Sequence, residues 1–499
     1  MRSVVLILWL VVCVLLTLRR PFFGAVAIMV HYVLKDMLIV ETYGFFNDVH
    51  FYEVLYITTV VGVFTTRGDR LGEFAPRGWV DWGIVGFFLA MLLSAGVNGV
   101  NVWDHKYVDL YFKAMVLYFL LSRLADTPRR MVITAVALVA ATSHLMFLAW
   151  EKVHVGSLVY ARPYWFSAQH DFGLQLVITL PLVGALMAAR LEGQVRVAAA
   201  ALLLVFFAFA WDSVSLASYR PALIGVLLCT VLAASLATGQ LRLMVRLALF
   251  VLIPFFVLVS LRCMSRSAYL GAGLGLAMLA WYYRRKVIVL ALAAPLVLFA
   301  VYHQTERVSA RLESVWTHKL PTGEVDTSID MRKEQMRTAM RILGANPIFG
   351  IGPRQFFLRY REWVSDEDFR GWSYTMHSVP LLILTEEGAL GFLMFYGFIV
   401  LGALRDARRA VALAREAPEL TDVAVVGAGA FMGFLAWAAF SLGQPAMWTI
   451  NIYGTVALIS AARRVTEATS VIFDDVPAPA EVEAPGLALR PATTEVLFS

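Results

Sequence analysis

Apolar runs of roughly 16 to 22 residues recur along most of the chain, and a helix of that length crosses about 30 Å of hydrocarbon. Of the 499 residues, 60% are hydrophobic and only 16% are charged, whereas soluble domains are about 25% charged. Backbone polar groups in lipid must be satisfied within the segment, which favours helices. The sequence therefore predicts an all-α polytopic membrane protein with about 12–15 transmembrane helices.

The runs also divide the chain into four parts. The predicted spans are residues 3–17, 22–37, 50–65, 79–97, 107–122, 131–149, 172–189, 197–212, 220–237, 244–261, 268–283, 287–302, 377–403, 421–441 and 447–462. The first run lacks the small-x-small cleavage site of a signal peptide, so we expect a retained span. The parts are an N-terminal bundle (1–302), an external loop carrying short helices (303–376), C-terminal spans (377–462) and a Pro/Ala/Glu-rich tail (463–499) typical of disordered chain.

Basic residues cluster in alternate connections between the runs. These connections include "LRRP", "TTRGDR", "SRLADTPRR", "YYRRK", "RDARR" and "AARR". Because positively charged connections stay in the cytoplasm, the net charge of +6 indicates orientation, and no nucleic-acid partner is expected. The loop 303–376 then lies outside the cytoplasm. We expect a multi-pass protein of the bacterial inner membrane, with that loop in the periplasm and the C-terminus in the cytoplasm.

Metal and disulfide chemistry have little support in the sequence. Cys13, Cys229 and Cys263 are far apart and lie in or beside apolar runs, which is typical of packed small hydrophobic residues. The sequence has no His/Cys cluster. We therefore expect no metal and no cofactor.

The external loop contains one clear helical pattern. "DTSIDMRKEQMRTAMRILGANPIFGIGP" predicts a helix from Ser328 or Asp330 to about Leu343, ended by Gly344. Met336, Met340 and Leu343 recur at i, i+4 and i+7 and define an apolar face. Arg332 stands four residues before Met336, so we expect it on the same buried stripe. It is either an arginine that reaches the membrane surface or an anion ligand aimed into the membrane domain.

Three further arginines are predicted on the external side, where the positive-inside rule disfavours them. Arg266 opens a span in "SRSAYLG", Arg220 lies at a similar depth in "ASYRPALIG", and Arg354 follows two glycines in "GIGPRQF". Each has a plain alternative, which is an interaction with lipid phosphate. A guanidinium also binds phosphate through two hydrogen bonds, so several arginines around one pocket suit a pyrophosphate.

Ionisable residues follow where the loop enters the membrane. His377 is either structural or a base, because neutral imidazole accepts a proton near neutral pH. Glu386 and Glu387 lie nine and ten residues further on. In a continuous helix they would lie about 14 Å below His377, which is too deep for direct proton transfer. Glu387 is therefore predicted as a structural group that pairs with another polar group in the bundle.

Taken in order, these motifs resemble the O-antigen ligase and Wzy-type polymerase superfamily of bacterial membrane glycosyltransferases. The matching segments are "SRSAYLG" (265–271), Arg332 in "SIDMRKEQ", "NPIFGIGPRQF" (346–356) and "HSVPLLILTEEGALG" (377–391). Ser267 replaces the usual Gly of this pattern, and Ser378 replaces the usual Asn. More loosely, the N-terminal half is similar to the subgroup linked to exosortase systems.

The resemblance implies transfer of a glycan from undecaprenyl pyrophosphate to an acceptor hydroxyl. It assigns His377 as the base, with Arg332 and Arg266 stabilising the departing pyrophosphate. Arg220 and Arg354 are weaker candidates for the same pyrophosphate site. The implied partners are the lipid-linked glycan donor, membrane lipids and an acceptor, which is another glycan, lipid A core or a protein. The motifs do not separate a polymerase from a ligase.

The alternative function is a lipid-linked glycan flippase or polysaccharide transporter. Many spans and buried acids fit that function, but an external basic loop that ends in a histidine does not. Transporters also often have two halves related by symmetry, and the sequence shows no such repeat.

Overall fold

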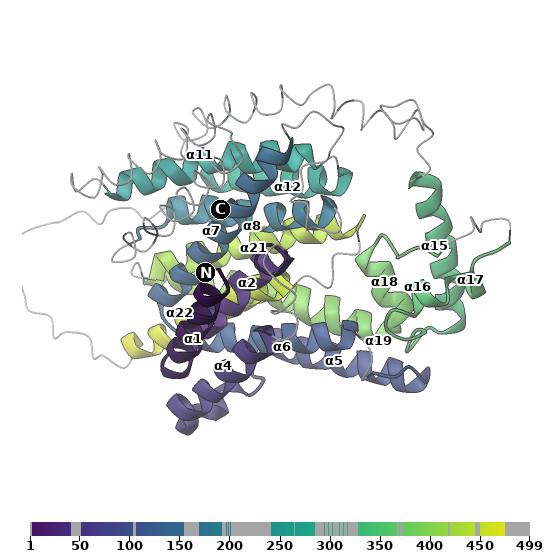
Figure 1. The fold of residues 1–499 in the computed structure, drawn as a ribbon, viewed down its shortest axis with the longest axis horizontal. Helices are drawn as coiled ribbons and strands as arrows, with labels where there is room; N and C mark the ends of the chain where they lie inside the picture. Colours follow the sequence, from purple (N-terminus) through teal and green to yellow (C-terminus); the bar gives the residue numbers. More distant parts are fainter. Residues whose placement is uncertain are drawn as a thin grey trace, which may run out of the picture.

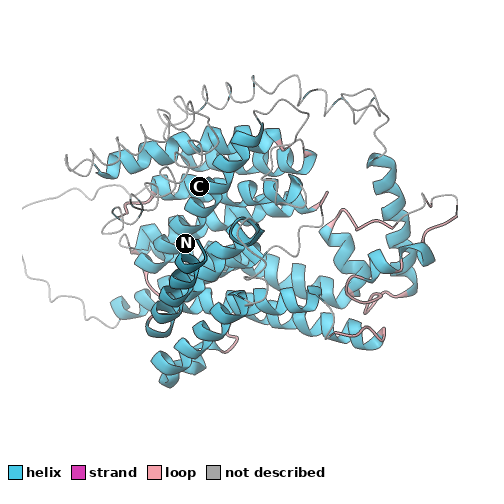
Figure 2. Ribbon diagram, in the orientation of Figure 1, coloured by secondary structure: helices cyan, strands magenta, loops and turns pink. Residues whose placement is uncertain are grey.

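The computed structural model describes residues 2–40, 51–102, 106–153, 169–191, 241–263, 265–284, 328–366, 373–417, 420–444 and 450–474, together with residue 369 and scattered positions within 196–200 and 294–317. Every regular element in these ranges is helical (Figure 2). The elements before the external loop are α1 (Arg2–Arg19), α2 (Pro21–Val40), α4 (Phe51–Arg67), η1 (Gly68–Phe74), α5 (Trp79–Val97), α6 (Lys106–Leu124), α7 (Pro128–Val153), α8 (Gln169–Ala188), α11 (Leu241–Arg262) and α12 (Arg266–Tyr283). The later ones are α15 (Ser328–Ala345), α16 (Gln355–Leu358), α17 (Tyr360–Trp363), α18 (Val379–Glu386), α19 (Gly388–Phe392), η2 (Leu393–Val400), α20 (Leu401–Glu416), α21 (Thr421–Ser441) and α22 (Ile450–Asp474).

Four of the described helical segments are long and apolar enough to cross a membrane. They are Trp79–Val97, Leu241–Arg262, Gly388–Glu416 and Thr421–Ser441. Pro21–Val33 and Phe172–Ala188 are shorter apolar helices. The predicted all-α polytopic membrane fold is confirmed. The spans predicted at 197–212, 220–237 and 287–302 lie almost entirely outside the described residues.

Small residues let the central helices of the bundle approach closely. α21 packs on α8, α12 and α22, and its sequence "GAGAFMG" puts glycines on the contact face. A Cβ added to Gly433 would lie 2.3 Å from the Ile178 carbonyl oxygen, and one added to Gly429 would lie 2.4 Å from the Ala185 Cβ. Glycines at this spacing are a common way for membrane helices to pack, because dispersion contacts grow as the backbones approach.

A lobe made of α15 to α18 lies at one end of this bundle (Figure 1). We call residues 328–386, as far as they are described, the lobe. α5 reaches it with its C-terminal end: Ser94 Oγ donates to the Glu386 carbonyl at 2.6 Å, and Asn98 Nδ2 donates to the Gly350 carbonyl at 3.1 Å. The lobe therefore rests directly on the ends of bundle helices.

The opposite end of the bundle is held by buried charges. Arg123, near the end of α6, donates to the carbonyls of Glu73 and Ala75 and pairs with Asp81 at 2.7 Å. Asp81 also accepts from Tyr118 at 2.6 Å. These contacts place the start of α5 and the end of α6 at the end of the bundle away from the lobe.

The predicted helix 377–403 is wrong as one continuous element. α18 ends at Glu386, Gly388 has a φ of +68°, and the apolar span that follows begins at Gly388. A left-handed residue breaks the i to i−4 ladder, so α18 and α19 do not share an axis. The predicted depth of Glu386 and Glu387, about 14 Å below His377, assumed a straight helix and therefore does not apply. Glu386 belongs to the lobe.

Candidate functional site

Two sequence-predicted site residues, Arg332 and His377, meet consecutive residues that follow α21. Arg332, on the first turns of α15, donates from Nη2 to the Gly443 carbonyl at 3.3 Å. The His377 Nδ1 lies 3.4 Å from Oε1 of Gln444. Both side chains are half-buried. The loop helix and the end of the loop are thus brought together over the end of a bundle helix.

Gln335 fixes the chain at His377. Its side-chain amide donates to the Thr375 carbonyl at 2.9 Å, and its carbonyl oxygen accepts from the His377 backbone N–H at 3.1 Å. Gln335 is buried, with 1% of its surface exposed. Because both ends of the amide are used, the backbone on either side of Met376 is held against α15.

The first turn of α12 completes this arrangement. Ser265 caps the helix through its side chain, which accepts from the Ala268 N–H. A Cβ added to Gly443 would lie 2.6 Å from Ser267 Oγ and 3.8 Å from Arg332 Nη1. The turn that begins with Arg266 is therefore next to the Arg332 guanidinium. We call Arg266, Ser267, Arg332, Gln335, His377, Gly443 and Gln444 the arginine–histidine site.

The inward face of α15 differs from the predicted apolar stripe. Met336 and Met340 are 53% and 58% exposed, so the expectation that they form a buried face is wrong. The buried positions are Glu334, Gln335, Thr338, Ala339 and Ile342. They mix polar and apolar side chains, because this face packs on the polar loop chain of the lobe. Arg332 lies on this face, three residues before Gln335, rather than on the methionine face.

The glycines of "NPIFGIGP" allow two backbone segments to approach each other closely. The N–H groups of Ile351 and Gly352 donate to the carbonyls of residues 385 and 386, both at 2.9 Å. In return, the N–H groups of residues 389 and 390 donate to the carbonyls of Pro347 and Ile348 at 2.9 and 3.2 Å. We call this pairing of residues 346–352 with 385–390 the glycine clasp.

Two clasp glycines have backbone geometry that other residues adopt at a cost. Gly350 and Gly388 have φ angles of +66° and +68°, in the left-handed region. A Cβ at Gly350 would lie 2.5 Å from the Glu386 carbonyl carbon, and one at Gly388 would lie 2.2 Å from the Ile348 carbonyl oxygen. The clasp fixes where the lobe meets the membrane span.

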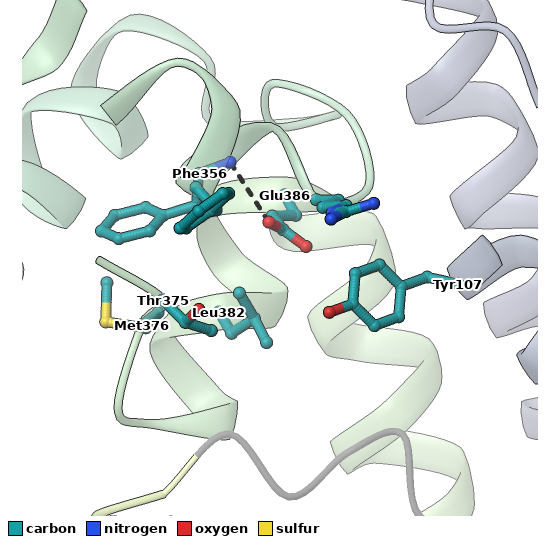
Figure 3. A pocket seen from close by; sticks show the side chains of 8 residues that line it. Tyr107, Phe356, Thr375, Met376, Leu382 and Glu386 are labelled. Atoms are coloured by element: carbon teal, nitrogen blue, oxygen red, sulfur yellow. Dashed lines mark hydrogen bonds between the residues drawn. The ribbon is translucent and has the colours of Figure 1, made fainter. Parts of the chain in front are cut away.

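A cavity of about 110 Å³ adjoins the clasp. Figure 3 shows Glu386, Phe356 and Tyr107 around it, with Thr375, Met376 and Leu382 on another side. Arg354 also lines it, and its guanidinium lies 5.5 Å from the Tyr107 ring centre. The structure thus places Arg354 beside Glu386, in a cavity distinct from the arginine–histidine site.

The Glu386 carboxyl group is enclosed by protein. It accepts from the Phe356 N–H at 3.2 Å. Burial raises the pKa of Glu386 to about 8, although the N–H groups of Arg354 and Phe356 and the Arg354 charge act in the opposite direction. This carboxyl group is therefore largely protonated at pH 7.

Glu387 differs from the prediction of a paired polar group. It is fully buried at the α18–α19 break, and within the described chain neither carboxylate oxygen has a hydrogen-bond partner. Burial, followed by the neighbouring Glu386, raises the pKa of Glu387 well above its ordinary value. A neutral carboxylic acid is the form that such surroundings favour.

Of the predicted site residues, Arg332, His377 and the helical turn of Arg266 are brought together. Arg354 lies elsewhere in the lobe, Glu387 lies at the α18–α19 break, and Arg220 lies outside the described residues. Sequence reasoning missed Gln335 and Gln444. The spacing Arg332–Gln335 placed one of them on the arginine's own helix face, but no pattern pointed to Gln444. In the described parts of the chain, no group of three or more His, Cys, Asp or Glu residues is arranged to hold a metal ion.

Comparison with known proteins identifies one segment. Residues 247–396 match the family model described as O-antigen ligase. The match covers the last helices before the external loop, the loop itself and the start of the following span, and it contains Arg266, Arg332 and His377. No curated protein matches the chain.

Proposed function

Because residues 247–396 match the O-antigen ligase family model, we propose that this membrane protein transfers a glycan from undecaprenyl pyrophosphate to an acceptor hydroxyl at the periplasmic face. The family-model match and the apolar helices support a glycosyltransferase-like enzyme of the inner membrane. The lipid carrier, the acceptor and the side of the membrane are part of the proposal.

The observation that carries this proposal is the convergence of Arg332 and His377 on residues 443 and 444. Arg332 comes from a helix within the external loop and His377 follows the end of that loop. In the proposal they carry the two functions that glycosyl transfer from a pyrophosphate needs. One is a base for the acceptor, and the other is a cation for the leaving group. A structural role for either residue alone does not require them to meet.

His377 acts as the base in the proposed reaction. With Oε1 of Gln444 accepting from Nδ1–H, the imidazole carries its lone pair on Nε2. Nε2 takes the proton of the acceptor hydroxyl while the oxygen forms a bond to the anomeric carbon. The bond from that carbon to the pyrophosphate oxygen breaks, and its electron pair leaves with undecaprenyl pyrophosphate.

Arg332 and Arg266 stabilise the charge that grows on the leaving pyrophosphate. Placed donors of this kind contribute roughly 2.7–4 kcal/mol of barrier lowering each in oxyanion sites. Arg354 lies beside Glu386 and Tyr107 in a cavity distinct from the arginine–histidine site, so it is not part of the proposed pyrophosphate contact. Since the arginines supply the positive charge, we expect transfer to continue in the presence of EDTA.

The proposal includes both a ligase and a polymerase. A ligase moves the glycan to lipid A core or to a protein, whereas a polymerase joins it to another lipid-linked glycan. Both reactions use the same base and the same leaving group. The acceptor end of the product distinguishes them.

The test uses membranes that contain the full chain, a labelled lipid-linked glycan and a candidate acceptor. We expect His377→Ala and Arg332→Ala to lower the transfer rate by at least ~100-fold at matched protein levels. The control is Arg337→Ala, because Arg337 is an exposed arginine of the same helix. It should retain most of the wild-type rate.

Undiminished transfer by His377→Ala would remove the catalytic assignment. Glycan that crosses the membrane without any new glycosidic bond would instead favour the flippase. Equal losses for Arg332→Ala and Arg337→Ala would show that general basicity of the helix, and not the position of Arg332, supports the reaction.

A further inference from the structure

A basic pocket of about 430 Å³ lies at the end of the bundle away from the lobe. Helices α1, α2, α4 and α7 contribute to it, and α1 packs on α4 at the point where a Cβ added to Gly62 would lie 2.6 Å from the Thr17 carbonyl oxygen. Figure 1 places α1 and α4 far from α15 to α17. The described residues that line it are Arg19, Arg20, Pro21, Phe22, Phe23, Thr66, Arg67, Leu124, Thr127, Arg129, Arg130 and Ile133.

The charge of this pocket is far from balanced. Five arginines line it, and no carboxylate does among the described residues. Asp126, at its edge, pairs with Arg67 at 2.7 Å and with Arg130 at 2.5 Å. One carboxylate thus serves two arginines, while Arg19, Arg20 and Arg129 make no ion pair within the described chain. Arg123 is buried and paired with Asp81, so its charge is compensated inside the protein. The charges of Arg19, Arg20 and Arg129 have no such compensation within the described chain.

The backbone adds to the positive potential. α7 begins at Pro128, and the Arg130 N–H donates to Thr127 Oγ1 at 3.3 Å. The N-terminal end of this 26-residue helix therefore opens at the pocket, where its N–H groups favour an anion. Arginines in this number, from three separate helix ends, suit a group with several phosphate oxygens.

Apolar side chains continue from the pocket along the bundle. Phe23 is 40% exposed, and Leu15 and Leu16 of α1 and Phe64 of α4 are 57%, 49% and 57% exposed. They lie within one or two turns of Arg19 and Arg67. A soluble anion makes no use of this surface, whereas acyl chains do. Basic pockets at the ends of membrane helices bind anionic lipid headgroups for the same reason.

We propose that this arginine pocket binds the phosphate headgroup of an anionic phospholipid, whose acyl chains lie along the exposed apolar faces of α1 and α4. Arg20 and Arg129 hold the phosphate oxygens, and the bound lipid joins the α1–α4 pair to the start of α7. The pocket is separate from the arginine–histidine site, so the proposal does not depend on the glycosyltransferase reaction.

The test measures the thermal midpoint of the delipidated full chain in neutral detergent. The probes are phosphatidylglycerol, phosphatidylcholine and inorganic phosphate at equal phosphate concentration. We expect phosphatidylglycerol to raise the midpoint by several degrees and the other two probes to leave it nearly unchanged. In Arg20→Gln/Arg129→Gln, the shift should fall to less than half.

The matched control is Arg242→Gln/Arg408→Gln. These exposed arginines lie at the same end of the bundle but outside the pocket, and this pair should keep the wild-type shift. An equal loss in the control pair overturns the proposal, because surface charge alone then explains the effect. A shift that inorganic phosphate reproduces also overturns it, in favour of a soluble anion.

If the glutamine pair does not fold, Arg20→Lys/Arg129→Lys replaces it. Lysine keeps the charge but loses the two-pronged contact to phosphate. A shift as large as that of the wild type in the lysine pair contradicts the assignment of these two arginines.

Discussion

The two ends of the helix bundle both hold buried or half-buried arginines, but they hold them differently. At the end away from the lobe, Arg123 pairs with Asp81 at 2.7 Å, and the network continues through Tyr118 and Ser460 to Asp406. At the lobe end, Arg332 donates to the Gly443 carbonyl at 3.3 Å, and His377 meets the Gln444 amide at 3.4 Å. In these contacts, carboxylates accept at the first end, and neutral amide oxygens accept at the second.

This difference separates structural charge from functional charge. A buried cation that is matched by a carboxylate, as Arg123 is, has its charge compensated inside the protein, and removing it leaves an uncompensated anion. A cation held by neutral oxygens retains most of its electrostatic potential for an incoming anion. In the arginine pocket, Asp126 pairs with two arginines, Arg67 and Arg130, so most of the positive charge of the five arginines that line it is not compensated within the described chain.

The largest expected effect comes from making the same substitution, arginine to methionine, at each end of the bundle. Arg123→Met should lower the free energy of unfolding by about 3–5 kcal/mol, because it leaves Asp81 buried and unpaired. Arg332→Met should change the free energy of unfolding by less than about 1 kcal/mol but should lower glycan transfer by at least ~100-fold. Thermal midpoints in detergent and transfer rates at matched protein levels measure the two effects.

The double variant Asp81→Asn/Arg123→Met is the control, because it removes both charges and should recover part of the lost stability. If Arg332→Met destabilises the protein as much as Arg123→Met does, both arginines are structural and the comparison fails.

The second effect concerns pH. Glu386 has a pKa of about 8 in the folded protein, against an ordinary value of 4.5. Below pH 4.5 the Glu386 carboxyl group is protonated in both the folded and the unfolded protein. Between pH 4.5 and about 8 it is protonated only in the folded protein. The free energy of unfolding therefore decreases as pH rises from about 4.5 to about 8, by on the order of a few kcal/mol. Glu386→Gln should make this decrease shallower, although Glu387 still contributes.

The thermal midpoint from pH 5 to 9 measures this effect. The reference is pH 5, where the wild-type carboxyl group is protonated and the amide is close to isosteric. Parallel profiles for the wild type and Glu386→Gln would contradict the assignment of the titration to this group.

The sequence predicted the helical membrane fold because the length and apolarity of each run are local properties, and they alone determine whether a segment can cross the hydrocarbon layer. It also placed Arg332 and His377 in one site through the order of motifs. It did not predict which face of α15 is buried. Met336 and Met340 had the stronger periodicity, but the face of Gln335 and Thr338 is the buried one. Gln335 on this face hydrogen-bonds to Thr375 and His377, which are distant in sequence.

The break at Gly388 was missed for a similar reason. "TEEGALG" is compatible with an unbroken helix, since an isolated glycine costs only about 1 kcal/mol there. The break is imposed by pairing with residues 346–352, about 40 residues earlier. The only sequence signal at the break is a glycine in each of the two paired segments, Gly350 and Gly388. This signal can be interpreted only once the structure shows that the two segments pair.

The third effect tests the glycine clasp. Gly388→Ala forces a Cβ into a left-handed residue and against the Ile348 carbonyl, so it should lower the free energy of unfolding by about 1–3 kcal/mol. Transfer should fall as well, because α18 positions His377. Gly344→Ala is the control, since a Cβ there meets nothing within 4 Å. Equal midpoints for the two variants would show that the clasp does not fix the lobe.

The smallest effect separates positioning from catalysis within the lobe end. Gln335→Leu removes the two hydrogen bonds that hold the backbone around Met376, while the side chain keeps its volume and its buried surroundings. We expect the rate of transfer at saturating substrate to fall by about 10-fold, which corresponds to about 1.4 kcal/mol. Substrate affinity should change less, because Arg332 and Arg266 are left intact.

The pH dependence of the rate distinguishes this role from a general loss of stability. Gln335→Leu leaves the imidazole in place but loosens its position, so the rate should fall at every pH without a change in the shape of the profile. Gln335→Glu keeps the acceptor for the His377 N–H and should restore part of the rate. Thr338→Val, a buried and nearly isosteric change one turn further along α15, should leave the rate within about 2-fold of wild type. If Thr338→Val lowers the rate as much as Gln335→Leu does, the inward face of α15 supports the lobe only as a packed surface, and the two hydrogen bonds to the His377 segment carry no specific part of the activity.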